Sequence, residues 1–487
     1  MNGNENMMRA DSISAADVSA LVAQRTAAPP RRLGALARAI AAEPVPQPVS
    51  PVVVTGILRA SELIGIAALG IAIFVMFIRP VNDTLQYLFA DASIAIGTVA
   101  MFQAFGLYNV QTFRTQIHQI SRVVAVWTTV FLIALTVAFF IKFEVSFSRV
   151  WAAAFYGTGM VALLAGRCLM ISLVRRWARE GRLVRRVVVV GGGKGGEALI
   201  DALSAEADTD LRICGLFDDR GDDRSQDIVG GIPKLGNVDD LVEFTRLTRI
   251  DLILVSLPMT AESRVLQMVK KLWVLPVDVR LAAHMNKLRF RPRAYSYIGN
   301  VPVLDIFDKP IADWNMVVKS AFDRVVGFFI LLAALPVMFL TAIAVKLDSP
   351  GPVFFRQKRY GFNNELIEIW KFRSLHHAQS DATASTLVGV GDSRVTRVGP
   401  RPHALNAKAE TRLYEEAVDG YFARHRVKPG ITGWAQINGW RGNTDTQEKI
   451  QRRIEHDLYY IENWSLLFDI YIVLRTPFAL LKAENAH

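Results

Sequence analysis

The sequence predicts a membrane protein in which four transmembrane helices precede a Rossmann-like α/β domain and an α-rich C-terminal domain that carries a re-entrant membrane helix. Three observations support this organisation. Hydrophobic residues make up 51% of the 487 residues and charged residues only 21%, which is too apolar for an ordinary soluble protein. Four long apolar stretches come early in the chain. A glycine-rich motif directly follows a run of valines.

The first 50 residues are polar and rich in Ala and Pro. They show no short charged leader before an apolar core, so we expect no signal peptide. We predict that residues 1–50 form a disordered cytosolic tail. Cys168 and Cys214 are the only cysteines in the sequence, which excludes a disulfide framework and favours a reducing cytosol around the soluble parts.

Four apolar stretches predict a four-helix transmembrane region over residues 51–175. Each is about long enough to cross a hydrocarbon core of ~30 Å at about 1.5 Å per residue. Basic residues concentrate before the first stretch, between the second and third, and after the fourth, so the positive-inside rule places the N-terminus in the cytosol. Glu62, Asp91 and Arg167 within the stretches are interpreted as paired or snorkelling groups. The stretches are 57–78, 85–108, 123–141 and 150–174.

A fifth apolar run, at 325–345, is predicted to be re-entrant. Basic residues flank it on both sides, so a crossing would place the rest of the chain outside the cell, against the charge rule. Pro336 lies at its middle and removes a helix hydrogen bond. We therefore predict two helical halves with a break at Pro336 that enter and leave one leaflet, with a fifth crossing helix as the alternative.

Residues 182–305 predict a doubly wound α/β domain. The run at 186–190 is typical of a buried strand, and three glycines after it match the Gly-x-Gly-x-x-Gly pattern of a nucleotide-binding turn. Asp218 and Asp219 end the next expected strand, at the place of a ribose-binding acid. The alternative is that the glycines only close a tight turn in a domain that binds nothing or binds a regulator. The three glycines are Gly191, Gly193 and Gly196.

The formal net charge of the chain is +11. The basic residues flank apolar runs instead of alternating with aromatic residues, so we expect no nucleic-acid partner. Anionic lipids and phosphorylated substrates are the better partners for this charge.

The C-terminal domain, residues 315–487, carries a series of motifs. They include Ser-Pro-Gly-Pro-Val-Phe-Phe-Arg-Gln, Trp-Lys-Phe-Arg-Ser, Pro-Arg-Pro-His-Ala and Val-Lys-Pro-Gly-Ile-Thr-Gly-Trp-Ala-Gln-Ile-Asn, which begin at positions 349, 370, 400 and 427. Together they resemble the polyprenyl-phosphate hexose-1-phosphate transferases, the monotopic phosphoglycosyl transferases that start bacterial exopolysaccharide repeat units. The Pro-Arg-Pro-His-Ala run looks most like the branch that uses UDP-glucose and undecaprenyl phosphate.

The resemblance implies a Mg²⁺-dependent transfer of hexose-1-phosphate from a UDP-sugar to undecaprenyl phosphate, with release of UMP. Glucose is the expected sugar, and galactose, which uses the same phosphate chemistry, stays an alternative. The resemblance also implies a multi-pass protein of the bacterial inner membrane whose N-terminus and two soluble domains face the cytosol. The expected partners are thus a UDP-sugar, undecaprenyl phosphate and the membrane, and a homo-oligomer is one of the assemblies that the sequence allows.

Basic residues within the motifs offer charge and bidentate donors to the phosphoryl oxygens of both substrates. Lys358 and Arg359 are interpreted instead as solvated or lipid-attracting surface charges, and His403 and His425 as either structural or catalytic. Glycines next to Thr432 suit a loop that brings backbone N–H groups near a phosphate. The expected phosphate-binding residues are Arg356, Lys371, Arg373, Arg401, Arg426, Lys428 and Thr432.

The chain departs from the family at the nucleophile, which is the Asp of an adjacent Asp-Glu pair between the Arg-Val-Thr-Arg-Val-Gly and Pro-Arg-Pro motifs. Here Gly399 is followed directly by Pro400, and no Asp-Glu dipeptide occurs in the sequence. A phosphoryl-aspartate mechanism needs that carboxylate to attack and, with its neighbour, to hold Mg²⁺. The catalytic residue and the metal ligands are therefore unassigned, and we expect an impaired enzyme.

Two other functions compete with this one. A non-catalytic membrane scaffold or regulator of polysaccharide assembly fits the missing pair, whereas the retained motifs favour a transferase. A membrane-anchored nucleotide-sugar dehydratase with NAD at residues 191–196 shares the layout. Such an enzyme would need a Tyr-x-x-x-Lys acid/base pair, which the central domain lacks.

Overall fold

The chain divides into two compact units. One takes its described residues from Met1–Glu43, Val187–Thr209 and Ile213–Phe307, and the other from Pro44–Arg186, Asp210–Arg212 and Asp308–His487. The computed structural model describes residues 33–77, 84–108, 116–140, 148–205, 210–220, 227–257, 262–282, 296–298, 301–376, 395–396, 408–409, 412–413, 421–440 and 446–481.

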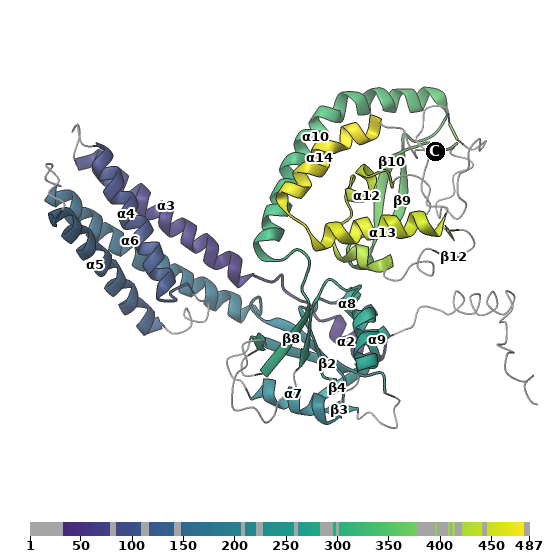
Figure 1. Cartoon of the computed structure of the whole chain (residues 1–487), viewed down its shortest axis with the longest axis horizontal. Helices are drawn as coiled ribbons and strands as arrows, with labels where there is room; N and C mark the ends of the chain where they lie inside the picture. Colours follow the sequence, from purple (N-terminus) through teal and green to yellow (C-terminus); the bar gives the residue numbers. More distant parts are fainter. Residues whose placement is uncertain are drawn as a thin grey trace, which may run out of the picture. The chain divides into compact units, whose positions relative to one another are not determined.

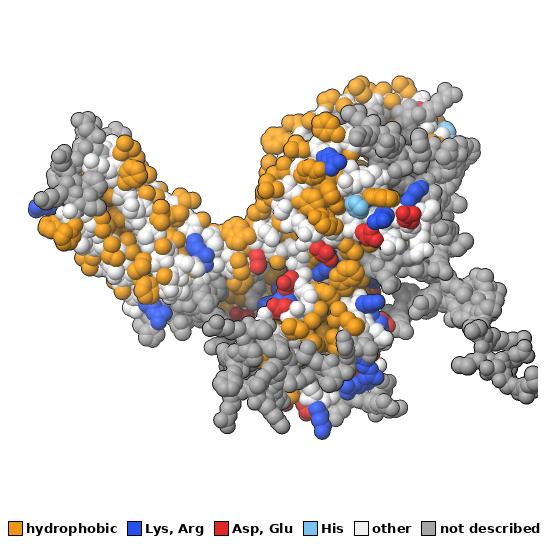
Figure 2. Space-filling view, viewed as in Figure 1, with side chains coloured by type: hydrophobic (Ala, Val, Ile, Leu, Met, Phe, Trp, Pro, Cys, Tyr) orange, Lys and Arg blue, Asp and Glu red, His pale blue; other side chains and the backbone are white. Residues whose placement is uncertain are grey.

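Five helices in the described part of the chain are long and apolar enough to cross a membrane. Four of them form a bundle that coincides with the four predicted stretches. Aromatic rings fill its core, where Trp127 lies 6.0 Å from Phe155 and 4.8 Å from Phe131 between ring centroids. Hydrophobic side chains also cover much of its outer surface (Figure 2), as a surface facing lipid requires. The helices are α3 (Pro51–Phe77), α4 (Thr84–Ala104), α5 (Gln116–Phe140) and α6 (Arg149–Arg179).

A buried ion pair joins α3 to α6 inside this bundle. The guanidinium of Arg167 is fully buried and lies 3.0 Å from the carboxylate of Glu62. It also donates to the carbonyl of Leu107 at 3.0 Å, and the Tyr108 hydroxyl donates to Glu62 at 2.7 Å. Glu62 and Arg167 are thus paired, as the sequence suggested. Asp91 is 2% exposed, so it is buried and does not snorkel to the interface.

The central domain is built on one mixed eight-stranded sheet in the order β3-β4-β2-β1-β5-β6-β8-β7. Strands β1, β5 and β6 pair in parallel, as do β2 and β4, whereas β8 runs antiparallel to β6. The order reverses beside β1, which agrees with the predicted doubly wound pattern. The strands are β1 (Arg185–Val190), β2 (Leu211–Phe217), β3 (Ile228–Val229), β4 (Ile232–Gly236), β5 (Leu252–Val255), β6 (Asp278–Ala282), β7 (Ser296–Ile298) and β8 (Val301–Phe307).

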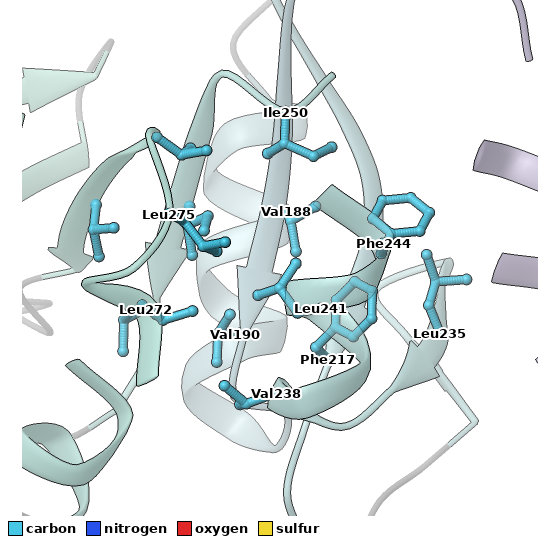
Figure 3. Packing of buried hydrophobic residues seen from close by; sticks show 14 of the residues in the cluster. Val188, Val190, Phe217, Leu235, Val238, Leu241, Phe244, Ile250, Leu272 and Leu275 are labelled. Carbon is cyan, nitrogen blue, oxygen red and sulfur yellow. The ribbon is translucent and has the colours of Figure 1, made fainter. Parts of the chain in front are cut away.

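The core of this domain surrounds the valines of β1. Figure 3 shows Val188 and Val190 among Phe217, Leu241 and Leu272. All five side chains are fully buried, which explains why the strand is a continuous apolar run instead of an alternating one. The covering helices are α7 (Lys194–Ser204), α8 (Val238–Leu247) and α9 (Glu262–Leu272).

Part of the expected disordered tail belongs to this core. Residues Ala35–Ala41 form helix α2, and Leu33, Ala37 and Ala41 are buried in the same cluster as the sheet. Ala37 and Ala41 are four residues apart, so they share one face of α2, and Leu33 lies just before this helix. A short apolar face among polar and proline-rich sequence was too weak a signal for a helix on its own. Residues 1–32 of the predicted tail lie outside the described residues.

The C-terminal domain begins with a single 36-residue helix, α10 (Asp313–Asp348), that contains Pro336. The predicted break at Pro336 is wrong, because the helix continues through it and is bent (Figure 1). A proline removes one helix hydrogen bond, which allows a bend without ending the helix. Only Val345 among the α10 side chains is buried.

Among the described residues, two antiparallel strand pairs, two short 3-10 helices and three α-helices follow α10. The helix α14 is held to α10 by the carboxylate of Asp469, which lies 3.0 Å from the ammonium of Lys319. Asp469 also accepts hydrogen bonds from Tyr460 and Trp464 at 2.7 and 2.9 Å. The described elements are β9 (Phe354–Tyr360), η4 (Phe362–Asn364), β10 (Leu366–Phe372), β11 (Lys408–Ala409), β12 (Arg412–Leu413), η6 (Tyr421–Arg426), α12 (Trp434–Ile437), α13 (Gln447–Glu462) and α14 (Leu466–Leu481).

We predict that Arg167→Ala destabilises the transmembrane bundle by about 3–5 kcal/mol, because it leaves the Glu62 carboxylate buried without a cation. The unfolding midpoint of the purified protein in detergent measures this loss. Arg176→Ala is the matched control on the same helix, since Arg176 is 72% exposed and pairs with Glu180 at the surface, where such a pair contributes about 0–1 kcal/mol. Equal midpoints for the two variants would contradict the structural importance of the buried pair.

Candidate functional site

The glycine-rich turn of the central domain has the strand–turn–helix geometry that the sequence predicted. Gly191 and Gly193 adopt φ values of +99° and +83°, which side chains other than glycine rarely tolerate. A Cβ at Gly196 would lie 2.4 Å from the carbonyl oxygen of Gly191, so the third glycine allows the helix to approach the turn. All three glycines are therefore required by the backbone.

A carboxylate already occupies part of this turn. Asp218 is buried, and its Oδ2 accepts a hydrogen bond from the Gly192 N–H at 2.8 Å. Asp219 accepts from the Val238 N–H at 2.8 Å. An NAD-type site needs the acid to be available to a ribose, and Asp218 is instead bonded within the domain. This arrangement favours a turn that is closed by the Asp218 side chain of the same domain. It disfavours the dehydratase alternative, because that enzyme needs the acid for its cofactor.

The β9–β10 hairpin places two of the expected phosphate-binding residues on opposite faces. Arg356 pairs in register with Trp370, and its guanidinium lies 4.7 Å from the centroid of that ring. Lys371 points to the other face, where its ammonium donates to Gln357 at 2.7 Å. Side chains alternate along a strand, so Arg356 and Lys371 do not meet at one site.

Arg373 anchors the end of α10. Its guanidinium is buried and donates to the carbonyls of Pro350 at 2.5 Å, Ser349 at 2.6 Å and Val345 at 3.4 Å. The last carbonyls of a helix have no partner within the helix, and a cation there is favourable. These contacts give Arg373 an anchoring role in addition to the phosphate contact that the sequence suggested.

The other expected ligands are spread over the domain. Arg426 is buried and donates to the carbonyl of Asp308 at 3.0 Å, and burial lowers the pKa of its guanidinium. Lys428 is exposed. The hydroxyls of Thr432 and Thr476 lie 2.8 Å apart, which ties this loop to α14. Arg401, His403 and the Gly399–Pro400 junction lie outside the described residues.

Four basic side chains near the hairpin influence one another's charge, and the sequence missed most of them. Arg359 of β9, Arg424 of η6 and Arg453 of α13 act electrostatically on one another. Burial lowers the pKa of Arg359 and of Arg453, and burial together with the charge of Arg359 lowers the pKa of Lys371 to about 8. The carboxylate in this group is Asp457, which lies 2.6 Å from Arg424. We call these four cations the cationic cluster.

The interpretation of Arg359 as a solvated surface charge is therefore wrong. Its side chain is half-buried because it lies on the same face of β9 as Gln357, which is fully buried. The alternation along β9 was the signal that could have found it. Arg453 and Asp457 are four residues apart on α13 and thus share a face, but nothing local indicates that this face meets the hairpin.

His425 makes contacts that hold neighbouring elements together. Its Nδ1 hydrogen bonds to Asn364 Oδ1, and its ring lies 6.1 Å from Tyr360 and 5.9 Å from Tyr421. The contacts of His425 with Asn364 and Tyr360 link η6 to η4 and to strand β9 of the hairpin. Of the two readings that the sequence left open, the geometry favours the structural one.

The described residues do not fit a magnesium ion. Mg²⁺ takes oxygen ligands, usually one or two carboxylates with waters and substrate phosphates. Within the described part of the chain no group of three His, Cys, Asp or Glu side chains could hold a metal, and the charged groups beside the hairpin are mostly cations. The ligands that the resemblance implied are the missing Asp-Glu pair.

Two domain families match the chain. A CoA-binding domain matches residues 103–283, and a bacterial sugar transferase domain matches residues 314–399 and 386–483. The transferase match is thus split into two stretches that overlap before Pro400.

Proteins of known name are similar over most of the chain. A UDP-glucose:undecaprenyl-phosphate glucose-1-phosphate transferase of Escherichia coli is 32% identical over 81% of this chain and 89% of its own length. Proteins of the same name from Xanthomonas campestris and Klebsiella pneumoniae are 29% and 32% identical, over 88% and 72% of this chain and 94% and 79% of their own lengths. The ordered motifs, the split transferase match and this identity lead to one conclusion: the chain belongs to the bacterial sugar transferase family.

Proposed function

We propose that the protein is a membrane transferase for hexose-1-phosphate, with UDP-glucose as donor and undecaprenyl phosphate as acceptor, and that the chain as written performs this step poorly. The names of the similar proteins support both substrates. This transfer would start the assembly of an exopolysaccharide repeat unit. The observation that carries the impairment is the direct join of Gly399 to Pro400, where the first of the two matched stretches ends.

The retained residues suit the handling of phosphates. In the transfer, the bond between the β-phosphorus and the oxygen bridging to UMP breaks, and the hexose-1-phosphate ends on an oxygen of the lipid phosphate. Negative charge on the phosphoryl oxygens is stabilised by fixed cations in a site of low water content. Lys371 and the arginines of the cationic cluster provide such charges beside the hairpin.

The missing function is that of the nucleophile. A covalent route forms a phosphoryl-enzyme on a carboxylate before the lipid attacks. Among the described residues, the carboxylate beside the cationic cluster is Asp457, and it is engaged by Arg424 at 2.6 Å. A carboxylate held by a guanidinium is a weak nucleophile, so Asp457 does not replace the lost pair. We assign any magnesium requirement to that pair, since the metal would supply charge stabilisation there.

The membrane arrangement in this proposal has four spans, a re-entrant α10 and both soluble domains in the cytosol of a bacterial inner-membrane protein. The 36 residues of α10 correspond to about 54 Å at about 1.5 Å per residue, which exceeds a ~30 Å hydrocarbon core. Its apolar side chains are exposed along most of its length (Figure 2). A bent helix with basic residues at both ends suits entry into and exit from one leaflet.

A non-catalytic scaffold or regulator of polysaccharide assembly is the second candidate. The absence of the Asp-Glu pair favours it. The cationic cluster favours a transferase, because a scaffold needs no half-buried cations.

We predict that the purified chain releases little UMP from UDP-glucose and undecaprenyl phosphate, and that insertion of the family's Asp-Glu segment between Gly399 and Pro400 raises the rate by at least about 100-fold, as expected when a nucleophile is restored. UMP release in detergent is the measurement. The control is the same insertion with Asn-Gln in place of Asp-Glu. Equal rates for the unmodified chain and the Asp-Glu insertion would show that another residue does the chemistry.

We predict that both ends of α10 face the cytosol. In a variant without Cys168 and Cys214, a cysteine at Arg324 or Leu347 should resist a membrane-impermeant thiol reagent added to intact cells and react after lysis. A cysteine at Arg149, at the expected outer end of the fourth span, is the positive control and should react in intact cells. Labelling of the Leu347 position alone in intact cells would establish a fifth crossing helix instead.

We predict that the affinity for UDP-glucose falls as the pH rises through about 8, the pKa of Lys371. Above that pH the ammonium loses its proton, and the face it shares with Gln357 and Arg359 loses one positive charge. A titration calorimetry series across this pH range measures the effect. Lys371→Arg should flatten the profile because a guanidinium stays protonated, and the same slope in both proteins would assign the pH dependence to another group.

A further inference from the structure

The start of α10 contacts the start of α3, the first helix of the transmembrane bundle. A Cβ atom placed on Gly56 of α3 would lie 2.6 Å from Cζ2 and 2.7 Å from Nε1 of Trp314 in the first turn of α10. No side chain fits at such distances, so the indole ring lies directly against the Gly56 backbone. The missing side chain of Gly56 therefore leaves a space on α3 that the Trp314 ring fills.

A hydrogen bond joins the same two helix ends. The hydroxyl of Ser50, which directly precedes α3, donates to Oδ1 of Asp313 at 2.6 Å. The Ser50 Oγ also accepts a hydrogen bond from the Val53 N–H at 3.3 Å. The first N–H groups of a helix have no partner within the helix, so Ser50 caps α3 and connects that helix end to α10.

Asp313 has a strained backbone where the two helices meet. Its φ is +48°, in the left-handed region that residues other than glycine rarely adopt. Its carboxylate accepts from Ser50, while α10 begins without a side-chain cap. A strained conformation persists only where the surrounding contacts hold it. The contacts of Ser50 with Asp313 and of Gly56 with Trp314 meet that requirement.

The three glycines of α3 have different surroundings. Gly56 faces Trp314 of α10, and Gly70 faces Asp91 of α4. Gly65 is exposed, and among the described residues no other segment lies within 4 Å of a Cβ placed on it. The fit to α10 is thus a property of Gly56, and Gly65 offers an open position on the same helix for comparison.

We propose that Ser50 and Gly56 form a docking surface for α10, and that Trp314 is a positioning residue that sets the depth at which α10 enters the membrane. Tryptophan prefers the level of the lipid headgroups, and Gly56 lies within the first two turns of α3. The bundle then anchors the transferase domain through α10. The contact is independent of the proposed function, which supplies only the cytosolic side of the membrane.

The first measurement is cross-linking in the full chain, purified in nanodiscs. Ser50→Cys and Asp313→Cys are combined in the variant that lacks both native cysteines, and a short bifunctional thiol reagent joins them. Adding Gly56→Leu should lower the cross-linking rate by about tenfold, because forcing a side chain into a filled space is unfavourable. Gly65→Leu is the matched control and should leave the rate unchanged, since it makes the same change at an open position.

A paired variant separates displacement of α10 from unfolding. Trp314→Ala removes the indole ring, so combining it with Gly56→Leu gives the leucine room and should restore most of the cross-linking. General destabilisation by the leucine would not be corrected by a second truncation. Equal rates for the Gly56→Leu and Gly65→Leu proteins, or no recovery in the paired variant, would overturn the docking surface.

The second measurement is the depth of α10 in the membrane. A fluorophore is attached to a cysteine at Phe328, which is 62% exposed on α10, and is quenched by lipids that carry a nitroxide near the headgroup or deep in the acyl chain. Gly56→Leu should change the ratio of shallow to deep quenching, whereas Gly65→Leu should not. An unchanged ratio in the Gly56→Leu protein would reject the positioning role of Trp314.

The failure of this proposal and the failure of the proposed membrane arrangement give different results. If labelling shows that α10 crosses the membrane while cross-linking and depth still depend on Gly56, the docking surface stays and the re-entrant arrangement is rejected. If both ends of α10 face the cytosol and cross-linking is insensitive to Gly56→Leu, the arrangement stays and the docking surface is rejected.

Discussion

The contact on which the C-terminal domain depends is the one between Arg373 and the end of α10. The last carbonyls of a helix have no partner within it. Here Val345 of the last turn, and Ser349 and Pro350 just after the helix, offer their carbonyls to one buried guanidinium. Arg373 directly follows β10, so the hairpin is tied to the end of the apolar helix. The hairpin, including Lys371, is thereby connected to the end of this apolar helix.

The sequence allowed prediction of those features that a local pattern determines. The turn of Gly191, Gly193 and Gly196 follows from steric needs of the backbone, and the apolar stretches follow from their length and composition. Helix α2 was missed because its stabilisation comes from packing of Leu33 and Ala37 against a sheet formed much later in the chain. Tertiary burial of this kind leaves only a short apolar pattern in the sequence.

The candidate site was predictable only in part, and for a related reason. The motif residues Lys371 and Arg373 were found, yet Lys371 belongs to the cationic cluster and Arg373 anchors a helix. Arg359 and Arg453 were missed because their function depends on which faces of β9 and α13 meet. A basic residue on a half-buried face and a basic residue exposed to solvent cannot be distinguished in a sequence. Only the three-dimensional arrangement of the elements distinguishes them.

The absence of the Asp-Glu segment at Gly399–Pro400 affects catalysis more than it affects the structure. Contacts between elements before and after the join persist, since Lys319 reaches Asp469 of α14 and Asn364 contacts His425 of η6. Catalysis requires interactions that are stronger in the transition state than in the ground state. A nucleophile contributes only to the transition state. Cations that hold phosphates stabilise both states, so substrate binding can be retained when catalytic turnover is lost. A chain that keeps these contacts without the carboxylate pair is therefore expected to separate substrate binding from reaction.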